Sequence, residues 1–450
     1  MYQILQLLRR TVPTSLLDLY HRMLSWLAAI WYGNPSQQMV VIGVTGTSGK
    51  TTTCYLISKV LEANGAKTGM MTTALFKIGE KTWENRTKMT MLGRFQAQKM
   101  LRDMRDTGCR YAVVESTSQG IAQHRHEHIA YDIVVLTNLW PEHIEAHGGF
   151  DQYKNAKKKL FTYTATLPKK KINGKTVPRV EILNAQNEHS ADFVVNGFER
   201  TVLFGAPPLV AEKIELQPER SSFNVGDVHV DVNLPGAVNV ENALAALAVA
   251  GAVGVQLRVA AKMLSDVPGL PGRYEHVNEG QPFIVLVDFA FEPGAMKKMY
   301  ELVLSQPHGR IIHVLGSAGG GRDAARRPIL GKMAGEYADI VVVTNEDPYD
   351  DEPKKIINDV AAGAKDAGKR DNVDLYRMED RADAIRFAIG QAAAGDVVLI
   401  TGKGSEPVMA VAGGRKIPWS DVGEARKALR MRPGAAEPVS ASKDASSNAS

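Results

Sequence analysis

Hydrophobic and polar residues alternate in blocks along most of this chain, and the blocks predict strands that are each followed by a helix. Residues 40–45, Val-Val-Ile-Gly-Val-Thr, form a β-branched run that is typical of a buried strand. Helical spacing starts at Lys50 and continues until Gly65 ends it. Further strand-like or helical segments lie at 70–75, 94–106, 111–115 and 131–139. Together they predict one α/β domain over residues 38–266.

The pattern repeats after a turn-rich linker at residues 267–272, Val-Pro-Gly-Leu-Pro-Gly. Strand-like and helical segments then alternate at 283–289, 294–305, 310–316, 327–338, 339–345, 353–364, 373–378, 381–393 and 396–401. Units of this length predict a Rossmann-like parallel sheet with helices on both faces. We therefore expect a second domain over residues 267–432 and a disordered tail, rich in Ala and Ser, over residues 433–450.

The first 37 residues follow a different pattern, because apolar residues crowd the stretch between Leu16 and Tyr32. Asp18, His21 and Arg22 interrupt the run, which is too short for a confident membrane span. No small-residue cleavage site follows, so a signal peptide is not expected. Two interpretations of residues 1–37 stay open: a helix that packs on the protein or on a second subunit, and a helix that lies on a membrane surface.

Composition narrows the class of protein. A chain of 450 residues with 44% hydrophobic residues suits a globular protein of about two or three domains. The net charge of +5 is small for this length and does not indicate a nucleic-acid partner. The two cysteines, Cys54 and Cys109, exclude a disulfide scaffold and a cysteine zinc site. We expect a cytoplasmic protein, at most peripheral at the inner membrane surface.

The strongest chemical signal is the segment Gly46-Thr47-Ser-Gly49-Lys50-Thr51-Thr52, between the first predicted strand and helix. Its glycines permit a tight turn, so loop N–H groups and the positive end of the helix point at one spot. Lys50 adds a mobile charge, and Thr51 or Thr52 offers a hydroxyl to Mg²⁺. The segment predicts a nucleoside triphosphate site. The alternative is a chance motif, since Val44 stands where the common P-loop has Gly.

Other candidate ligands follow later strands. Glu115 ends a predicted strand, where parallel sheets bind ligands and where a carboxylate beside a P-loop can hold Mg²⁺. A surface glutamate is the alternative interpretation. The segment after residue 139 contains His143 and His147, whose spacing fits either metal ligands or coincidence. Lys157 lies in a helical segment whose lysines, taken alone, are typical of a solvated face.

Ordered motifs resemble the Mur ligase family of ATP-dependent amide ligases, and most closely its MurE subfamily, which adds the third residue of the peptidoglycan stem peptide. The first predicted domain contains the 45–52 loop, Glu115-Ser-Thr-Ser-Gln119, Thr137-Asn-Leu139, Glu142-His143 and Tyr153-x-x-Ala-Lys157-x-x-Leu-Phe161. The later motifs are Asn239-x-x-Asn242-Ala, Gly272-Arg273, Asp288-Phe-Ala-Phe291, Arg322-Asp-x-x-x-Arg327 and Gly402-Lys-Gly-Ser-Glu406. The resemblance covers residues 38 to about 410.

The resemblance implies ATP and two Mg²⁺ ions as cofactors. Glu115, His143 and the Thr51 hydroxyl would bind Mg²⁺, with Asn138 beside them. Lys157 would be carbamylated, which creates an anion able to help hold the second ion. The implied nucleotide-binding residues are Gly46, Thr47, Gly49, Lys50, Thr51, Thr52, Asn242, Arg273 and Asp288. The implied catalytic residues are Lys50, Glu115, His143, Lys157 and Arg273.

The resemblance also implies contacts to two further substrates, an anionic acceptor such as a UDP-sugar peptide and an amino acid. The implied contact residues are Thr90, Ser118, Arg125, Arg327, Glu346, Asp347, Tyr349, Gly402 and Glu406. Relatives that add diaminopimelate carry Asp-Asn-Pro-Arg where this chain has Glu346-Asp-Pro-Tyr349. Without that arginine, a second carboxylate on the amino acid loses its bidentate partner. We therefore expect a diamino acid such as lysine, drawn to Glu346, Asp347, Asp350 or Asp351.

The sequence thus predicts a P-loop-type central ATPase domain and a C-terminal Rossmann-like domain, preceded by a short apolar helix. The expected enzyme joins an amino acid to a UDP-MurNAc-dipeptide-like carboxylate through an acyl phosphate. MurE enzymes grip the UDP-sugar with an N-terminal domain of roughly a hundred residues, which 37 residues cannot build. One alternative is a ligase for a different or lipid-linked acceptor. Another is a non-catalytic ATP-binding partner protein. This alternative stays open because Met91, Gln119, Phe291 and Ser405 stand where the family motifs carry other residues.

Overall fold

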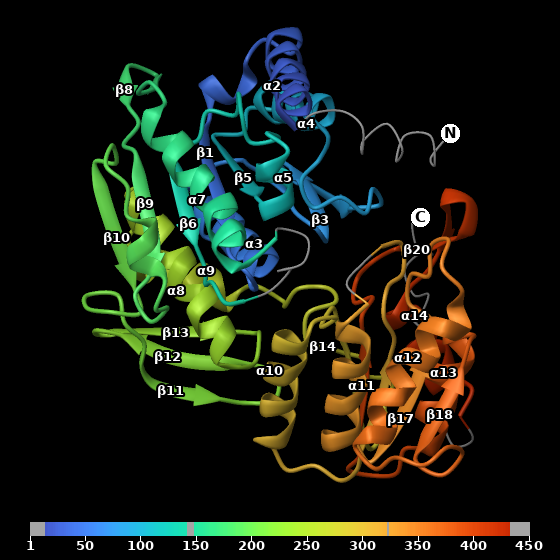
Figure 1. Ribbon diagram of the computed structural model, residues 1–450. Coiled ribbons are helices and arrows are strands. Elements are labelled where there is room, and N and C mark those ends of the chain that lie inside the picture. The colour runs from blue at the N-terminus through green and yellow to red at the C-terminus, as the bar shows by residue number, and fades with distance from the viewer. Residues whose placement is uncertain (1–13, 142–147, 322–323, 433–450) are drawn as a thin grey trace, which may run out of the picture.

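The computed structural model describes residues 14–141, 148–321 and 324–432, which form two large sheets that follow one another along the chain (Figure 1). The first sheet has eight strands in the order β10-β9-β6-β1-β5-β2-β3-β4. The strands are β1 (Val40–Thr45), β2 (Thr68–Met71), β3 (Leu75–Ile78), β4 (Lys81–Glu84), β5 (Tyr111–Glu115), β6 (Ile133–Leu136), β9 (Val180–Asn184) and β10 (Arg200–Phe204). Neighbours are parallel from β10 to β2, whereas β3 and β4 continue antiparallel.

Helices cover both faces of this sheet. They are α3 (Lys50–Leu61), α4 (Arg94–Asp106), α5 (Ser118–Ala122), α7 (Phe150–Thr166), α8 (Ala237–Ala252) and α9 (Leu257–Ser265). Ile42 and Val44 of β1 join the apolar core that includes α3, α8 and α9. Val41 joins the opposite core, under α4 and α7. A strand buried on both faces is a continuous apolar run, which is why the sequence pattern predicts β1 so clearly.

The second sheet has six strands in the order β14-β15-β19-β16-β17-β18, all parallel except β14. The strands are β14 (Glu275–His276), β15 (Ile284–Asp288), β16 (Ile311–Leu315), β17 (Ile340–Thr344), β18 (Leu375–Met378) and β19 (Val397–Thr401). Helices α10 (Pro293–Leu304), α11 (Arg326–Tyr337) and α12 (Pro353–Asp366) pack on one face. Helices α13 (Arg381–Gln391) and α14 (Asp421–Arg430) pack on the other. This is the predicted Rossmann-like arrangement.

Smaller elements fill in around the two sheets. A three-stranded antiparallel sheet contains β11 (Glu212–Leu216), β12 (Ser221–Val225) and β13 (Val228–Val232). Two hairpins contain β7 (Lys171–Ile172), β8 (Lys175–Thr176), β20 (Val408–Val411) and β21 (Arg415–Pro418). Short 3₁₀ turns lie at η1 (Pro35–Gln38), η2 (Glu62–Asn64), η3 (Ser190–Phe193) and η4 (Ala412–Gly414). The second hairpin faces the first sheet, because Lys416 donates to the backbone oxygen of Thr87 over 3.0 Å.

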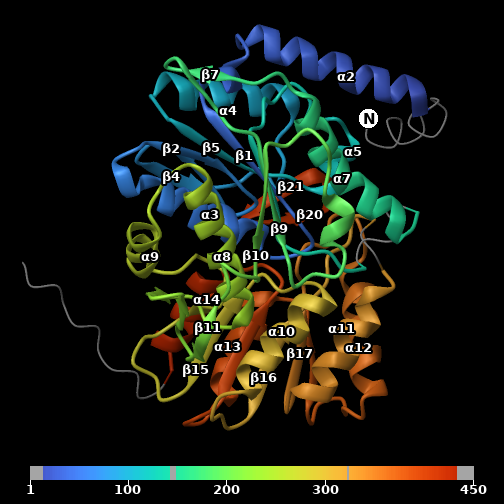
Figure 2. The same cartoon turned by 90° about the vertical axis from the view of Figure 1, so that its left-hand side faces the viewer.

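Helix α2 (Thr14–Trp31) lies at the end of the molecule remote from the second sheet in both views (Figures 1 and 2). It packs beside α4 and buries its small residues Ser25, Ala28 and Ala29. Eight of its large apolar residues are between 41% and 75% exposed: Leu16, Leu19, Tyr20, Met23, Trp26, Leu27, Ile30 and Trp31. Within the described residues, every helix falls short of the length and apolar character that a membrane crossing needs.

The alternating segments predicted after residue 272 coincide with strands and helices of the second sheet, with differences of a few residues at their ends. One prediction in the first sheet is wrong. Residues 70–75 do not form a single strand, because Thr72 closes a turn with Leu75 by accepting and donating hydrogen bonds. The chain therefore reverses between β2 and β3. The domain boundary at residue 267 stays a prediction, and it falls between the last helix over the first sheet and the first strand of the second.

Candidate active site

The phosphate-loop motif lies where β1 ends and α3 begins. Gly46 and Gly49 adopt φ values of +151° and +75°, which glycine tolerates best. A Cβ atom at Gly46 would lie 1.9 Å from the Thr137 hydroxyl oxygen, and one at Gly49 would lie 2.3 Å from the Asn242 side-chain oxygen. The loop therefore has the glycines that its conformation and its close packing require.

Hydrogen bonds from the neighbouring strand hold this loop. The N–H groups of Thr47 and Ser48 donate to the backbone and side-chain oxygens of Asn138, each over 2.9 Å. The Thr137 hydroxyl donates to the Ser48 carbonyl over 2.8 Å. The Lys50 ammonium donates to the Thr47 carbonyl over 2.7 Å. Asn138, expected beside the metal ligands, thus acts as a clamp on the loop, while Lys50, Thr51 and Thr52 begin α3 at the cavity wall.

Two of the predicted magnesium ligands lie together in the structure. The Thr51 hydroxyl donates to Glu115 Oε2 over 2.9 Å, so the two side chains present oxygen atoms at one point beside the loop. Thr73 orients the same carboxylate through its N–H, at 2.8 Å, and its hydroxyl, at 3.0 Å. Hard oxygen donors of this kind suit Mg²⁺. The third predicted ligand, His143, lies outside the described residues, as does His147.

Lys157 projects from α7 into the protein and is only 2% exposed, so its helix does not present it as a solvated face. Its ammonium donates to the Gly46 carbonyl over 2.7 Å and lies 4.4 Å from the centre of the Tyr153 ring. Tyr153 in turn donates to the Thr47 hydroxyl over 3.1 Å. The predicted carbamylation site therefore lies against the first residues of the phosphate loop.

The predicted acceptor residues lie on the same side of the cavity. The Thr90 hydroxyl pairs with the Thr73 hydroxyl at 2.9 Å. Ser118 begins the short helix α5 and is buried. Arg125 donates to the Gln123 side chain over 2.7 Å, and its Nε finds no hydrogen-bond partner within the described residues. Burial lowers the pKa of Arg125. An anion would satisfy that guanidinium.

Arg273 and Asp288 face these residues from the second sheet. The Arg273 guanidinium lies 4.5 Å from the centre of the Phe289 ring. Asp288 ends β15 and accepts hydrogen bonds from the N–H groups of Tyr274, at 2.8 Å, and Ala290, at 2.7 Å. Burial raises the pKa of Asp288, and the charge of Arg273 opposes that rise. The Phe289 ring thus supports the arginine.

One cavity of about 700 Å³ joins the two sides. Its wall includes Thr47, Gly49, Lys50, Thr51, Thr52, Lys88, Thr90, Glu115, Ser118, Arg125, Asn242, Arg273, Asp288, Phe291, Arg326 and Glu406. Asn242 reaches the loop through α8, where it accepts from the Thr53 hydroxyl over 3.1 Å. Most sequence-predicted nucleotide and acceptor residues therefore meet in a single space, large enough for a substrate and a nucleotide to lie side by side.

The predicted amino-acid residues are arranged less simply. Glu346 is 4% exposed and its Oε2 has no hydrogen-bond partner within the described residues. Burial raises the pKa of Glu346, and Arg326 opposes that rise. Gly402, with φ +104°, leaves room for this carboxylate, since a Cβ there would lie 2.5 Å from Glu346 Oε2. Tyr349 adopts a left-handed φ of +53° with its ring against Gly320.

Arg327 is placed differently from its predicted role. Its guanidinium forms ion pairs with Asp359, at 2.9 Å, and Asp351, at 3.5 Å, and it is not among the residues that line the cavity. The preceding residue, Arg326, lines the cavity instead. Arg326 is 6% exposed, its Nε and Nη2 have no hydrogen-bond partner within the described residues, and it stacks 5.2 Å from the Phe291 ring centre.

Sequence reasoning missed Arg326 because two adjacent arginines in a helix give no sign of which one faces inward. It also missed Thr73, which the wrong strand prediction for residues 70–75 concealed. The sequence analysis assigned no role to Lys88 either. Its ammonium pairs with Asp347 and with Glu406, two of the predicted amino-acid residues.

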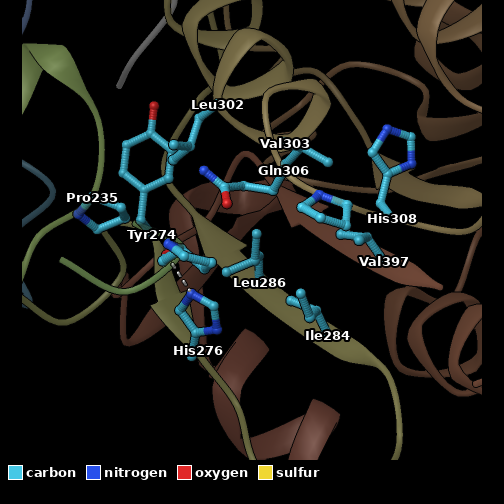
Figure 3. A pocket seen from close by; sticks show the side chains of 12 residues that line it. Pro235, Tyr274, His276, Ile284, Leu286, Leu302, Val303, Gln306, His308 and Val397 are labelled. Atoms are coloured by element: carbon cyan, nitrogen blue, oxygen red, sulfur yellow. Dashed lines mark hydrogen bonds between the residues drawn. The ribbon is translucent and has the colours of Figure 1, made fainter. Parts of the chain in front are cut away.

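A second, small pocket has a volume of about 30 Å³, and its lining includes no residue of the phosphate loop. Figure 3 shows the side chains that line it. Pro235, Tyr274, Leu286 and Leu302 are among the largely apolar residues around it. His276 contacts the Pro218 carbonyl at 3.1 Å. Its size and apolar lining suit packing between the three-stranded sheet and the second large sheet rather than chemistry.

Comparison with known proteins agrees with this geometry. The Mur ligase middle domain matches residues 44–250, and the Mur ligase glutamate ligase domain matches residues 272–404. The chain is 41% identical to a UDP-N-acetylmuramyl-tripeptide synthetase from Roseiflexus sp. (strain RS-1), over 90% of this chain and 81% of the relative. It is 34% identical to a UDP-N-acetylmuramoyl-L-alanyl-D-glutamate--2,6-diaminopimelate ligase from Geobacillus kaustophilus (strain HTA426), over 94% and 85% of the two chains.

A solved structure of a UDP-N-acetylmuramoyl-L-alanyl-D-glutamate--2,6-diaminopimelate ligase is also similar. It aligns with a TM-score of 0.57 and 26% identity, over 91% of this chain and 82% of that one. Similarity therefore extends through both sheets and across the cavity between them. Mur ligases are ATP-dependent enzymes that form amide bonds, and this chain belongs to the Mur ligase family.

Proposed function

We propose that the chain joins an amino acid to the free carboxylate of a UDP-N-acetylmuramoyl dipeptide, as a ligase of peptidoglycan precursor synthesis. The observation that carries this proposal is the shared cavity. Its wall includes the phosphate loop and Glu115 on one side and Arg273 and Glu406 on the other. A nucleotide, a carboxylate and an amine can therefore meet in one cavity, which suits a ligation that proceeds through a reactive intermediate.

The reaction has two steps. A carboxylate oxygen of the acceptor attacks the γ-phosphorus of ATP, the bond from that phosphorus to the β–γ bridging oxygen breaks, and ADP leaves. The product is an acyl phosphate. The neutral amino group of the amino acid then attacks the acyl carbon, the carbon–oxygen bond to phosphate breaks, and inorganic phosphate leaves as the amine loses a proton.

We assign the first step to the loop and to Arg273. The Lys50 ammonium and the N-terminus of α3 offset the negative charge that develops on the phosphates. Arg273 approaches from the second sheet, with Phe289 behind its guanidinium. Arg125, whose Nε lacks a partner within the described residues, would hold the anionic acceptor together with Thr90 and Ser118. Asn242 and Asp288 would contact the rest of the nucleotide.

Mg²⁺ would be held by the Thr51 hydroxyl and the Glu115 carboxylate, and it would offset phosphate charge in the first step. We propose that His143 completes this site and that a second ion lies near Lys157. The Lys157 ammonium would first lose a proton. The neutral amine would then attack CO₂, forming an N–C bond and releasing a second proton, so that an anion replaces a cation. Lys157 is buried beside Gly46, close to the phosphate loop. An uncarbamylated ammonium at that place would repel an incoming metal ion, which supports the proposed carbamylation.

The amino acid would bind at the edge of the second sheet, near Gly402, Glu406, Glu346 and Asp347. Tyr349 has no charge with which to hold a second carboxylate, whereas several buried carboxylates stand nearby. We therefore propose lysine or another diamino acid without a distal carboxylate. Greater turnover with diaminopimelate than with lysine would contradict this assignment.

We also propose that the exposed face of α2 contacts a membrane surface. Tyr20, Trp26 and Trp31 are aromatic residues of the kind that favours the lipid interface. Figure 2 shows β7 at the same end of the molecule. Lys171 of β7 and Lys175 of β8 are exposed. Lys170, next to β7, donates to the Ser36 carbonyl over 3.0 Å. Ser36 belongs to the turn that follows α2, so the hairpin lies beside the end of that helix.

Vesicle co-sedimentation tests this contact. The protein should bind vesicles that contain anionic lipid more strongly than neutral ones, and a Trp26→Ser, Trp31→Ser variant should lose binding. Trp83→Ser, on β4 in another part of the surface, is the matched control and should bind normally. Absence of vesicle binding, together with concentration-dependent dimers that the double variant abolishes, would show instead that a second copy covers this face.

The main proposal is tested by phosphate release from ATP with UDP-MurNAc-dipeptide as acceptor. Lysine, ornithine, diaminopimelate and no amino acid are compared. Turnover that needs both the acceptor and one amino acid is the expected result, with the ligated product confirmed by mass. Demonstrated ATP binding without turnover in any combination would contradict the proposed acceptor.

A further inference from the structure

A loop of the first sheet reaches the amino-acid side of the cavity. Lys88 lies on this loop in a left-handed conformation, with φ +60°, and its side chain is only 8% exposed. Its ammonium forms ion pairs with Asp347 and, at 2.6 Å, with Glu406 Oε2. The two carboxylates expected to attract an amino acid are therefore occupied by a side chain of the enzyme itself.

The charges in this cluster balance. Lys403 is fully buried and donates to Asp347 Oδ1 over 2.9 Å, to Glu406 Oε2 over 2.6 Å and to the Val408 carbonyl over 2.8 Å. Asp347 also accepts from the Ala410 N–H over 2.7 Å. Two ammonium groups thus face two carboxylates. Burial alone would raise the pKa of Asp347, but Lys403 and Lys88 together hold it below its ordinary value.

The two lysines differ in how firmly they are held. Lys403 belongs to the second sheet and has a third, backbone acceptor, so it is part of that sheet's structure. Lys88 comes from the other side of the cavity, and the cavity wall includes both Lys88 and Glu406. If Lys88 withdrew, the cluster would hold one uncompensated negative charge in a poorly hydrated place, which is costly. Another ammonium group in the same place would restore the charge balance.

We propose that Lys88 occupies the subsite for an ammonium group of the incoming amino acid, and that the amino acid displaces it. This rests on the proposed ligase function. An ammonium group that takes the place of Lys88 donates to Asp347 and Glu406, and in that form it has no lone pair with which to attack the acyl phosphate. The group that replaces Lys88 is therefore the distal ammonium of a diamino acid, not the reacting amine.

The displacement bears on selectivity. An amino acid with an apolar side chain has no charge to exchange for Lys88, so Lys88 would exclude it. Lys88 also lies two residues before Thr90, whose hydroxyl pairs with Thr73, and Thr73 in turn contacts Glu115. Movement of this loop would therefore shift Thr90, which is proposed to contact the acceptor, and through Thr73 it would shift the Glu115 carboxylate.

The test uses Lys88→Ala and Lys88→Met in the full chain, with Lys416→Ala as the matched control. Lys416 also reaches the loop, through the Thr87 carbonyl, but it stands outside the charge cluster. If Lys88 fills the subsite about nine-tenths of the time, its removal lowers the apparent KM for lysine about tenfold. The KM values for ATP and acceptor should stay unchanged, and norleucine should remain a poor substrate of the wild type while improving in Lys88→Met.

A binding measurement separates this proposal from the ligase assignment. n-Butylammonium should raise the melting temperature of Lys88→Ala, and n-butanol should not, whereas neither should affect the wild type or Lys416→Ala. Loss of amine-specific stabilisation, or a higher KM for lysine in both Lys88 variants, would overturn the proposal. A wild type that shows no acceptor-dependent turnover would contradict the ligase function alone, because the melting experiment does not need catalysis.

Discussion

The two walls of the cavity are built on different physical principles. On the phosphate-loop wall, amide and hydroxyl groups position the loop and its carboxylate: Asn138 clamps the loop, and Thr51 and Thr73 orient Glu115. On the opposite wall, buried charges such as Lys403 and Asp347 compensate one another. The first wall can accept an anion without reorganising, as electrostatic preorganisation requires. The second must exchange one charged group for another, so ligand selection belongs to that wall.

The largest effect should come from the preorganised wall. Lys50→Met should reduce acceptor-dependent ADP formation on the order of 10³-fold, because it removes the charge that stabilises the transferring phosphate. ADP release in a coupled assay measures it. Lys59→Met, on the same helix but paired with Glu62, should be almost normal. Near-normal turnover of Lys50→Met would remove the basis for treating this loop as the phosphate site.

The next effect concerns Glu115. Glu115→Gln keeps the size of the side chain but removes its charge, so it should lower kcat/KM about 10²-fold and raise the Mg²⁺ concentration needed for half-maximal activity. A magnesium titration of turnover measures both quantities. Glu84→Gln, exposed on β4, is the matched control. An unchanged magnesium requirement would show that the metal is held elsewhere.

Acid stability compares the two halves directly, since each buries a histidine. Burial lowers the pKa of His126 to about 4 and that of His313 to about 3. The unfolded chain binds a proton near pH 6.5, so it gains protons before the native state does and stability falls as the pH falls below 6.5. Between pH 7 and pH 5 each histidine should cost about 2 kcal/mol of unfolding free energy.

Urea unfolding at the two pH values measures this loss. In His313→Gln the acid-dependent loss should shrink by about 2 kcal/mol, whatever the variant costs at pH 7. His229→Gln, on the small antiparallel sheet and exposed, should leave the loss unchanged. An identical pH dependence in the wild type and His313→Gln would mean that His313 titrates normally in the folded protein.

The smallest effect should come from replacing Arg326, and it tests whether the charged wall binds the carboxylate of the amino acid. The Nε and Nη2 atoms of Arg326 have no hydrogen-bond partner in the part of the chain that the structure describes, which suits the α-carboxylate of the amino acid. A hydrogen bond to a charged group contributes about 1.5–3 kcal/mol. Arg326→Met should therefore raise the KM for the amino acid about tenfold or more, with the KM for ATP unchanged. Steady-state kinetics measures both, with the exposed Arg370→Met as control. A change confined to the KM for ATP would assign Arg326 to the nucleotide instead.

Local pattern was sufficient to predict most of the architecture. The strand β1, the glycine loop and α3 follow one another within a short stretch. The burial of the strand, the turn and the start of the helix can therefore all be predicted from neighbouring residues. The alternating segments of the second sheet follow for the same reason. The exception at residues 70–75 arose because Thr72 turns the chain through a side-chain hydrogen bond, which hydrophobic periodicity does not reveal.

Contacts between distant residues depended on the tertiary structure. The sequence by itself determined the parallel α/β plan, the phosphate loop and the resemblance to the Mur ligase family. The first two rest on residues close together in the chain, and the third rests on a series of short motifs, each of them local. Only the folded structure decided that Arg326 rather than Arg327 lines the cavity. It also decided that the Lys88 ammonium pairs with the carboxylates of Asp347 and Glu406. Burial and charge compensation between separate elements set those choices, and neither is a property of a local segment.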